Sequence, residues 1–272
     1  MWYRVLRVPY TLHVYRYSTV RKPRATLLFL HGIGNSGRTW EHVVDQLPAD
    51  VNVIIVDLLG FGDSPQPAWA RYDAATQAKA VAKTLWQLRL THRVIIVGHS
   101  MGTLVAVEFA RRYPALVRSL VLFSPPIYSL DTRDKRRFLV RDAQLRRIYD
   151  LMARRPTAVG AIMRLGARYK LLNPDMDVER LNLTIYAQAL RANIINQTTF
   201  RDVVKLKKPI AILYGTLDPV VIGATLRELR KKSGYITVQR FVGGHEIVRG
   251  YVDRAASLIT QVVDETIGYN KK

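Results

Sequence analysis

The sequence contains no cysteine among its 272 residues. This absence excludes disulfides, thiolate nucleophiles and cysteine-ligated metals. It also lacks any run near the roughly 20 apolar residues that a membrane-spanning helix needs. The first residues, Met-Trp-Tyr-Arg-Val, show no apolar core of a signal peptide. We therefore expect a cytoplasmic protein without a transmembrane segment.

Acidic residues are scarce: 21 Asp and Glu stand against 42 Lys and Arg, a formal net charge of +21. Such an excess is typical of proteins that bind nucleic acid or anionic surfaces. The basic residues are spread over the whole chain, however, and no nucleic-acid-binding motif accompanies them. We predict no specific nucleic-acid partner and, at most, weak association with anionic surfaces.

Short apolar runs alternate along the chain with segments of helical periodicity. The expected strands are 26–30, 51–56, 94–97, 118–123, 209–214 and 235–241, and the expected helices are 39–47, 73–88, 101–112, 222–232 and 251–267. This alternation predicts an α/β protein with an open, mostly parallel sheet and helices on both of its faces. Residues 2–8 and 10–17, split by Pro9, predict an antiparallel hairpin at one edge.

The alternation stops for about eighty residues in the middle of the chain. Between 127 and 205 the pattern is helical only, with arginines on most of the faces opposite the apolar stripes. We expect these residues to form a helical cap inserted into a core made of residues 1–126 and 206–272. The cap is expected to cover the substrate.

The clearest local motif is Gly98-His99-Ser100-Met101-Gly102, which follows four consecutive β-branched residues. A fully buried parallel strand is thus expected to turn within a few residues into a helix. The two glycines allow strand and helix to approach closely, while Ser100 occupies a strained, exposed turn at the carboxyl edge of the sheet. The motif predicts that Ser100 is a nucleophile.

A serine nucleophile needs a base, and the base needs an orienting carboxylate. The chain supplies both in loops that follow later strands: Asp218 comes after the strand 209–214, and His245 follows the strand 235–241. The carboxyl ends of parallel strands share one edge, so Ser100, Asp218 and His245 are expected to meet there.

These motifs resemble those of the α/β-hydrolase family over essentially the whole chain. The shared elements are His31-Gly32-x-Gly34, Asp57-x-x-Gly60-x-Gly62-Asp63-Ser64, Gly98 to Gly102, Gly215-x-x-Asp218-x-Val220 and Gly244-His245. The resemblance implies that Ser100 is the nucleophile, His245 the general base and then acid, and Asp218 the orienting carboxylate. It also implies an oxyanion hole made by the backbone N–H groups of Ile33 and Met101. Gly32, Gly34 and His99 are expected to line the substrate site.

The resemblance also limits which reactions of the family this chain is expected to catalyse. Dehalogenases and epoxide hydrolases of this family use an aspartate where this chain has Ser100. Carbon–carbon hydrolases of meta-cleavage pathways use serine, but their motifs differ from this sequence at Asn35-Ser36, Leu217 and Glu246. Hydrolysis of a small carboxylic ester or lactone is therefore the favoured activity. A carbon–carbon hydrolase, a non-catalytic ligand receptor and a basic nucleic-acid scaffold are the alternatives.

Other ionisable residues are assigned structural roles. Asp57 and Asp63 are expected to fix a turn, and His31 to hold the oxyanion loop by hydrogen bonds. Ser124 ends the strand 118–123, where some family members carry the acid, and a serine cannot serve as one. No His and carboxylate group has the spacing of metal ligands, so neither a metal nor another cofactor is implied.

Overall fold

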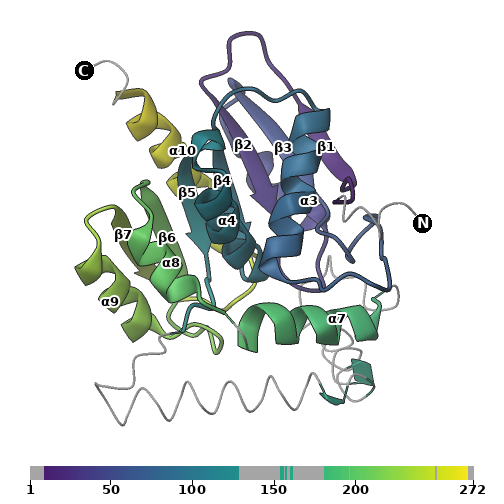
Figure 1. Cartoon of the computed structure of the whole chain (residues 1–272). Coiled ribbons are helices and arrows are strands. Elements are labelled where there is room, and N and C mark those ends of the chain that lie inside the picture. The colour runs from purple at the N-terminus through teal and green to yellow at the C-terminus, as the bar shows by residue number, and fades with distance from the viewer. Residues whose placement is uncertain are drawn as a thin grey trace.

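The computed structural model describes residues 9–128, 154–155, 157, 160–161, 181–195, 197–248 and 250–268. The predicted α/β architecture is confirmed: the described strands form a seven-stranded sheet in the order β1-β3-β2-β4-β5-β6-β7 (Figure 1). Its strands are β1 Val14–Ser18, β2 Ala25–Leu30, β3 Val51–Val56, β4 Val94–His99, β5 Val117–Phe123, β6 Ile210–Gly215 and β7 Ile236–Phe241.

Strands β2 to β7 are all parallel, and β1 pairs with β3 in the antiparallel sense. Among the described residues the partner of β1 is β3, so the expected hairpin of residues 2–17 stays a prediction. Residues 2–8, the other arm of that hairpin, lie outside the described residues. The antiparallel edge itself is where the sequence places it.

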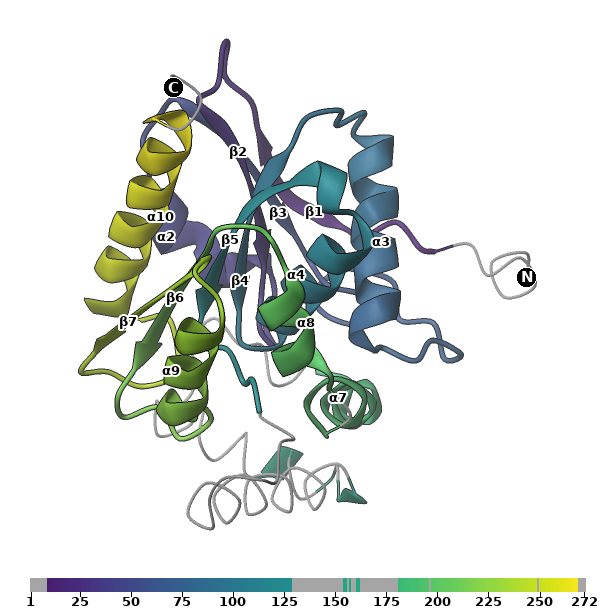
Figure 2. The ribbon, with the colours of Figure 1, turned by 60° about the vertical axis from the view of Figure 1, so that its left-hand side comes forward.

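Helices cover both faces of the sheet, as Figures 1 and 2 show. The described helices are α2 Glu41–Val44, α3 Ala74–Gln87, α4 Met101–Arg112, α7 Leu183–Leu190, α8 Thr199–Lys205, α9 Gly223–Lys232 and α10 Gly250–Gly268, with short 3-10 turns at Gly37–Trp40 and Pro114–Leu116 and a π-helical turn at Arg191–Ile195. None of the described helices is long and apolar enough to span a bilayer.

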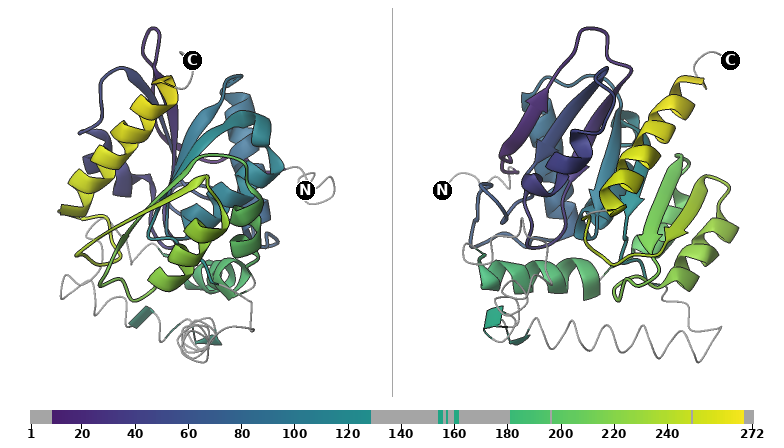
Figure 3. Two further views of the ribbon diagram at one scale, coloured as in Figure 1. Left: turned by 90° about the vertical axis from the view of Figure 1, so that its left-hand side faces the viewer. Right: turned by 180° about the vertical axis from the view of Figure 1, so that it is seen from behind.

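Each face of the sheet has its own apolar core, because neighbouring strand residues point to opposite sides. In β2, Leu28 and Leu30 pack with α3 and α4, whereas Leu27 and Phe29 pack with α2 and α10. Helix α10 runs obliquely across that second face (Figure 3). The central strands are buried on both faces, which is why their sequences are continuously apolar.

The order of the strands sets the position of the site. The chain passes from β2 to β3 on one side and then returns to place β4 on the other side of β2. The loops after β2 and β4 therefore diverge from adjacent strand ends, the kind of switch point where ligands bind in open α/β sheets. The predicted oxyanion loop, residues 31–36, and the Ser100 turn thus lie side by side.

Part of the predicted cap is described. Helix α7 lies across the carboxyl edge of the sheet (Figures 1 and 3), and Ile185 packs so closely on Gly60 that a Cβ there would lie 2.7 Å from its Cγ2. Helix α8 packs against α4 and α9. Most of residues 129–180 lie outside the described residues, so the division into cap and core stays a prediction.

We predict that Gly102→Ala destabilises the fold. A Cβ at Gly102 would lie 2.2 Å from the carbonyl oxygen of Leu30, a backbone atom that cannot move without shifting β2. Overpacking of this kind costs typically about 1–3 kcal/mol. Gly234→Ala is the matched control, because nothing lies within 4 Å of its Cβ position, and its effect should stay within about 0.5 kcal/mol. Equal urea midpoints for the two variants would contradict the prediction.

Candidate active site

Ser100 forms a sharp turn between β4 and α4. Its backbone has φ 49° and ψ −120°, a left-handed conformation that is rare for a residue with a side chain. The turn is held by the Ser100 N–H, which donates to the carbonyl of Phe123 at 3.0 Å. A Cβ at Gly98 would lie 2.8 Å from the carbonyl oxygen of Gly102, so strand and helix meet backbone to backbone. This is the strained turn that the motif predicts.

Of the three predicted triad side chains, His245 lies between the other two, within hydrogen-bond distance of each. Nε2 of His245 is 3.0 Å from Oγ of Ser100, and Nδ1 is 2.8 Å from Oδ2 of Asp218. Because an ionised carboxylate can only accept, Nδ1 carries the proton and Nε2 is free to accept one from the serine hydroxyl. The geometry suits proton transfer from Ser100 to His245.

Asp218 is held as an anion by its loop. Its Oδ1 accepts hydrogen bonds from the backbone N–H groups of Val220 at 2.8 Å and Val221 at 3.2 Å. Burial of the carboxylate opposes ionisation, but the imidazole of His245 and these donors outweigh it and lower the pKa of Asp218. The Ser124 hydroxyl contributes to the same lowering.

His245 has a pKa above the ordinary histidine value. Burial of the ring favours the neutral form, but the hydrogen bond and charge of Asp218 outweigh it, with a smaller contribution from Glu246. The His245 side chain is 17% exposed while that of Asp218 is 0% exposed. His245 is therefore partly accessible from outside, whereas Asp218 is fully buried.

Backbone contacts hold two loops together: the loop after β6, which carries Asp218, and the loop after β7, which carries His245 and is called the histidine loop below. The Leu217 N–H donates to the carbonyl of Gly243 at 2.9 Å, and the Thr216 N–H donates to that of Phe241 at 2.8 Å. A Cβ at Gly215 would lie 2.1 Å from the Gly243 carbonyl oxygen, so only glycine permits this approach. The distance between Asp218 and His245 thus depends on two loops that touch through their backbones.

The oxyanion loop lies against Ser100. A Cβ at Gly32 would come 3.2 Å from Cβ of Ser100, and Gly34 has a positive φ of 77°. Within the described part of the chain, the N–H groups of Ile33 and Met101 donate no hydrogen bond. Both are free to act as the donors that the sequence predicts.

His31 holds the oxyanion loop from below, as expected. Its Nδ1 donates to the Gly32 carbonyl at 2.7 Å, and its Nε2 accepts from the Leu58 N–H at 2.8 Å. The ring is fully buried, and burial lowers its pKa. A neutral His31 with this tautomer satisfies both bonds, so both of its ring nitrogens are already engaged.

His99 is one of the residues expected to line the substrate site, but it does not face an open surface. Its side chain is fully buried, and its Nε2 lies 2.9 Å from the carbonyl oxygen of His245. The predicted contact of His99 with substrate stays a prediction, but this burial gives it no support.

Near Asp218, Ser124 contacts Tyr251, and the sequence analysis does not predict this contact. The Ser124 hydroxyl lies 3.0 Å from the hydroxyl of Tyr251, which donates to the Leu213 carbonyl at 3.1 Å. Ser124 also has a positive φ of 47°. It occupies the end of β5, as predicted, and joins α10 to the neighbourhood of Asp218.

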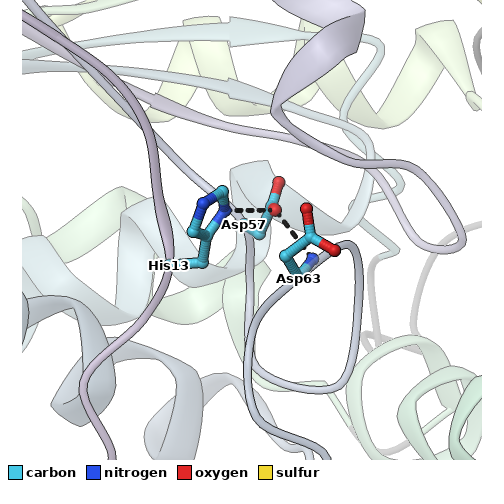
Figure 4. A group of neighbouring side chains, drawn as sticks. All are labelled: His13, Asp57 and Asp63. Carbon is cyan, nitrogen blue, oxygen red and sulfur yellow. Dashed lines mark hydrogen bonds and ion pairs between the residues drawn. The ribbon is translucent and has the colours of Figure 1, made fainter.

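Asp57 serves the structure of its turn (Figure 4). Its carboxylate accepts hydrogen bonds from the N–H of Gly37 at 2.6 Å and of Asp63 at 2.9 Å, and lies 2.9 Å from Nδ1 of His13. A Cβ at Gly62 would lie 2.3 Å from Oδ2 of Asp57.

The ligand atoms of His13, Asp57 and Asp63 lie within 4.8 Å of one another, a grouping that the sequence spacing does not indicate. Both oxygens of Asp57 already accept backbone hydrogen bonds, however. These hydrogen bonds account for the cluster as a structural link between the N-terminal edge of the sheet and the loop after β3.

A family model for the α/β hydrolase fold matches residues 25–248, so the chain belongs to the α/β-hydrolase fold family. Among curated proteins it is similar to the probable lysophospholipase BODYGUARD 3 of Arabidopsis thaliana, at 32% identity over 50% of this chain and 28% of that protein. It is also similar to Lipase 1 of Psychrobacter immobilis, at 24% identity over 75% of this chain and 66% of that protein.

The first of these matches spans less than a third of the relative's own length. Among solved structures, a thermophilic esterase from Thermogutta terrifontis superposes with a TM-score of 0.70, at 19% identity over 94% of this chain and 93% of the other. At that identity the superposition shows the shared fold alone.

We predict that the ring of His245 titrates above the usual histidine pKa and that Asp218→Asn lowers this value. The asparagine removes the negative charge that favours the imidazolium and leaves the burial that disfavours it. The measurement is a ¹⁵N-histidine NMR titration of both proteins. An unchanged His245 pKa in the variant would show that the pair is not electrostatically coupled.

Proposed function

We propose that this protein is a serine hydrolase that cleaves carboxylic esters through an acyl-enzyme intermediate. The observation that carries the proposal is the unbroken line of contacts from Asp218 through His245 to Ser100, at 2.8 and 3.0 Å. The names of the relatives, a lipase, a lysophospholipase and an esterase, agree with an ester substrate.

In the first half of the reaction, Oγ of Ser100 attacks the ester carbonyl carbon and its proton passes to Nε2 of His245. The N–H groups of Ile33 and Met101 stabilise the oxyanion of the tetrahedral intermediate. His245 then protonates the leaving alkoxide as the carbon–oxygen bond breaks. The alcohol departs, and the acyl group stays on Ser100.

In the second half, His245 takes a proton from water, and the resulting hydroxide attacks the acyl carbonyl. Collapse of the second intermediate breaks the bond to Oγ, which recovers its proton from His245. Asp218 keeps its charge throughout and stabilises the imidazolium formed in each half. A lactone, as an internal ester, follows the same steps. We further propose that the cap of residues 127–205 shapes the substrate site.

Ser100→Ala should abolish ester turnover while leaving the fold intact. Loss of the nucleophile lowers kcat by about 10⁶-fold in a serine hydrolase. The measurement is hydrolysis of p-nitrophenyl butyrate, together with labelling by a serine-directed fluorophosphonate. Ser257→Ala is the control, because Ser257 is an exposed serine on α10 and should remain fully active. Substantial turnover by Ser100→Ala would disprove the assignment.

The positive charge should affect the encounter with substrate and leave the chemistry unchanged. Besides burial, the groups that shift the pKa values of Asp218 and His245 are, within the described residues, each other, Glu246, Ser124 and the backbone of Val220, with no Lys or Arg among them. Exposed charges are screened beyond a Debye length of about 8 Å at physiological salt. Raising NaCl to that level should leave kcat on a neutral short-chain ester unchanged, while adsorption to anionic surfaces falls.

The comparison is KM for a neutral ester and for its carboxylate-bearing analogue over the same range of salt. A salt-sensitive preference for the acidic ester would show that the substrate is anionic and that arginines recognise it. That result would contradict a purely surface role for the charge while leaving the triad chemistry in place.

A further inference from the structure

His99 fills the space behind the catalytic histidine. The absent side chain of Gly98 faces the backbone of α4, 2.8 Å from the Gly102 carbonyl oxygen. Since successive strand residues point to opposite faces, His99 points away from α4. There its ring lies 5.0 Å from the ring of His245, and its Nε2 lies 2.9 Å from the His245 carbonyl oxygen.

The contact fixes the tautomer of His99. A carbonyl oxygen only accepts, so Nε2 of His99 carries the hydrogen, and Nδ1 of the neutral ring carries none. Nδ1 is buried and has no hydrogen-bond partner among the described residues. A Cβ at Gly32 would lie 3.1 Å from it, so this side of the ring packs against the oxyanion loop.

The surroundings of His99 disfavour a charge on its ring. Burial, and then the neighbouring His245, lower the pKa of His99 to about 4, although the carboxylates of Glu246 and Asp218 act in the opposite direction. A hydrogen on Nδ1 would also have no acceptor among the described residues. The imidazolium that forms on His245 during turnover therefore has an uncharged neighbour.

We infer that His99 is a positioning residue: through the hydrogen bond that it donates to the His245 carbonyl, it holds the histidine loop at the correct distance from Ser100. Its role in turnover rests on the proposed function, whereas the hydrogen bond itself does not. This side chain comes from the residue before Ser100, donates to the loop that carries His245 and packs against the loop 31–36. Among the described residues, its one hydrogen bond goes to the His245 carbonyl oxygen, so it acts through His245.

The test compares two amides of similar polarity. In His99→Gln the side-chain N–H reaches the position of Nε2 and can still donate to the His245 carbonyl. In His99→Asn the shorter amide reaches only the position of Nδ1. A misplacement of about 1 Å can cost about 10²-fold in rate, so His99→Asn should lower kcat on p-nitrophenyl butyrate by about 10- to 10²-fold at little changed KM.

His99→Gln should retain most of the kcat of the parent protein. Labelling of Ser100 by a fluorophosphonate should slow in the same order, since it needs the same base. Circular dichroism and thermal unfolding check that both variants fold. Equal kcat values for the two variants, or a loss confined to KM, would overturn the inference; the latter result would indicate a substrate contact.

A measurement on the unmodified protein does not depend on turnover or on any variant. ¹⁵N-histidine NMR should show His99 as the neutral Nε2–H tautomer from pH 8 to about pH 5. The Nδ1–H tautomer, or titration near the ordinary histidine pKa, would overturn the inference. A protein that neither hydrolyses esters nor reacts with the fluorophosphonate would disprove the proposed function, and the tautomer would still decide the hydrogen bond.

Discussion

The close approach of α4 to the sheet is the constraint on which the site depends. The Cβ position of Gly102 lies 2.2 Å from the Leu30 carbonyl oxygen, so the first turn of α4 lies directly against the end of β2. This contact brings the Met101 N–H beside the loop that carries Ile33. It also forces Ser100 into a left-handed backbone conformation, a strain that the surrounding packing must hold.

The second requirement is to keep a charge inside the protein. Burial raises the pKa of the Asp218 carboxyl, but His245 and two backbone donors outweigh it and lower the pKa. The same pair makes His245 more basic than burial alone would allow. The two loops are joined by a backbone hydrogen bond between Leu217 and Gly243. The pKa shifts of Asp218 and His245 therefore depend on the backbone positions of these loops.

The sequence predicts the parts of this structure that have a local cause. Parallel strands buried on both faces are continuously apolar. Gly98 and Gly102 mark the sharp turn at Ser100, because a side chain at either position would collide with the backbone. The partner of β1 has no such cause. It depends on which edge is free, and β3 offers it. Contacts between residues far apart in the chain cannot be predicted from the local sequence pattern. An example is the contact of Ser124 with Tyr251, 127 positions apart.

Strand β4 shows how one short segment can organise both halves of the chemistry. At Gly98 the strand has no side chain, and α4 enters that space with its backbone. At His99 the side chain fills the opposite face and meets the backbone of the histidine loop. The alternation of a strand therefore places the predicted oxyanion donor on one face and the proposed base on the other. Ser100 comes where the strand ends, so its hydroxyl lies between them, and a shift of β4 by one residue would exchange the two faces and separate all three groups.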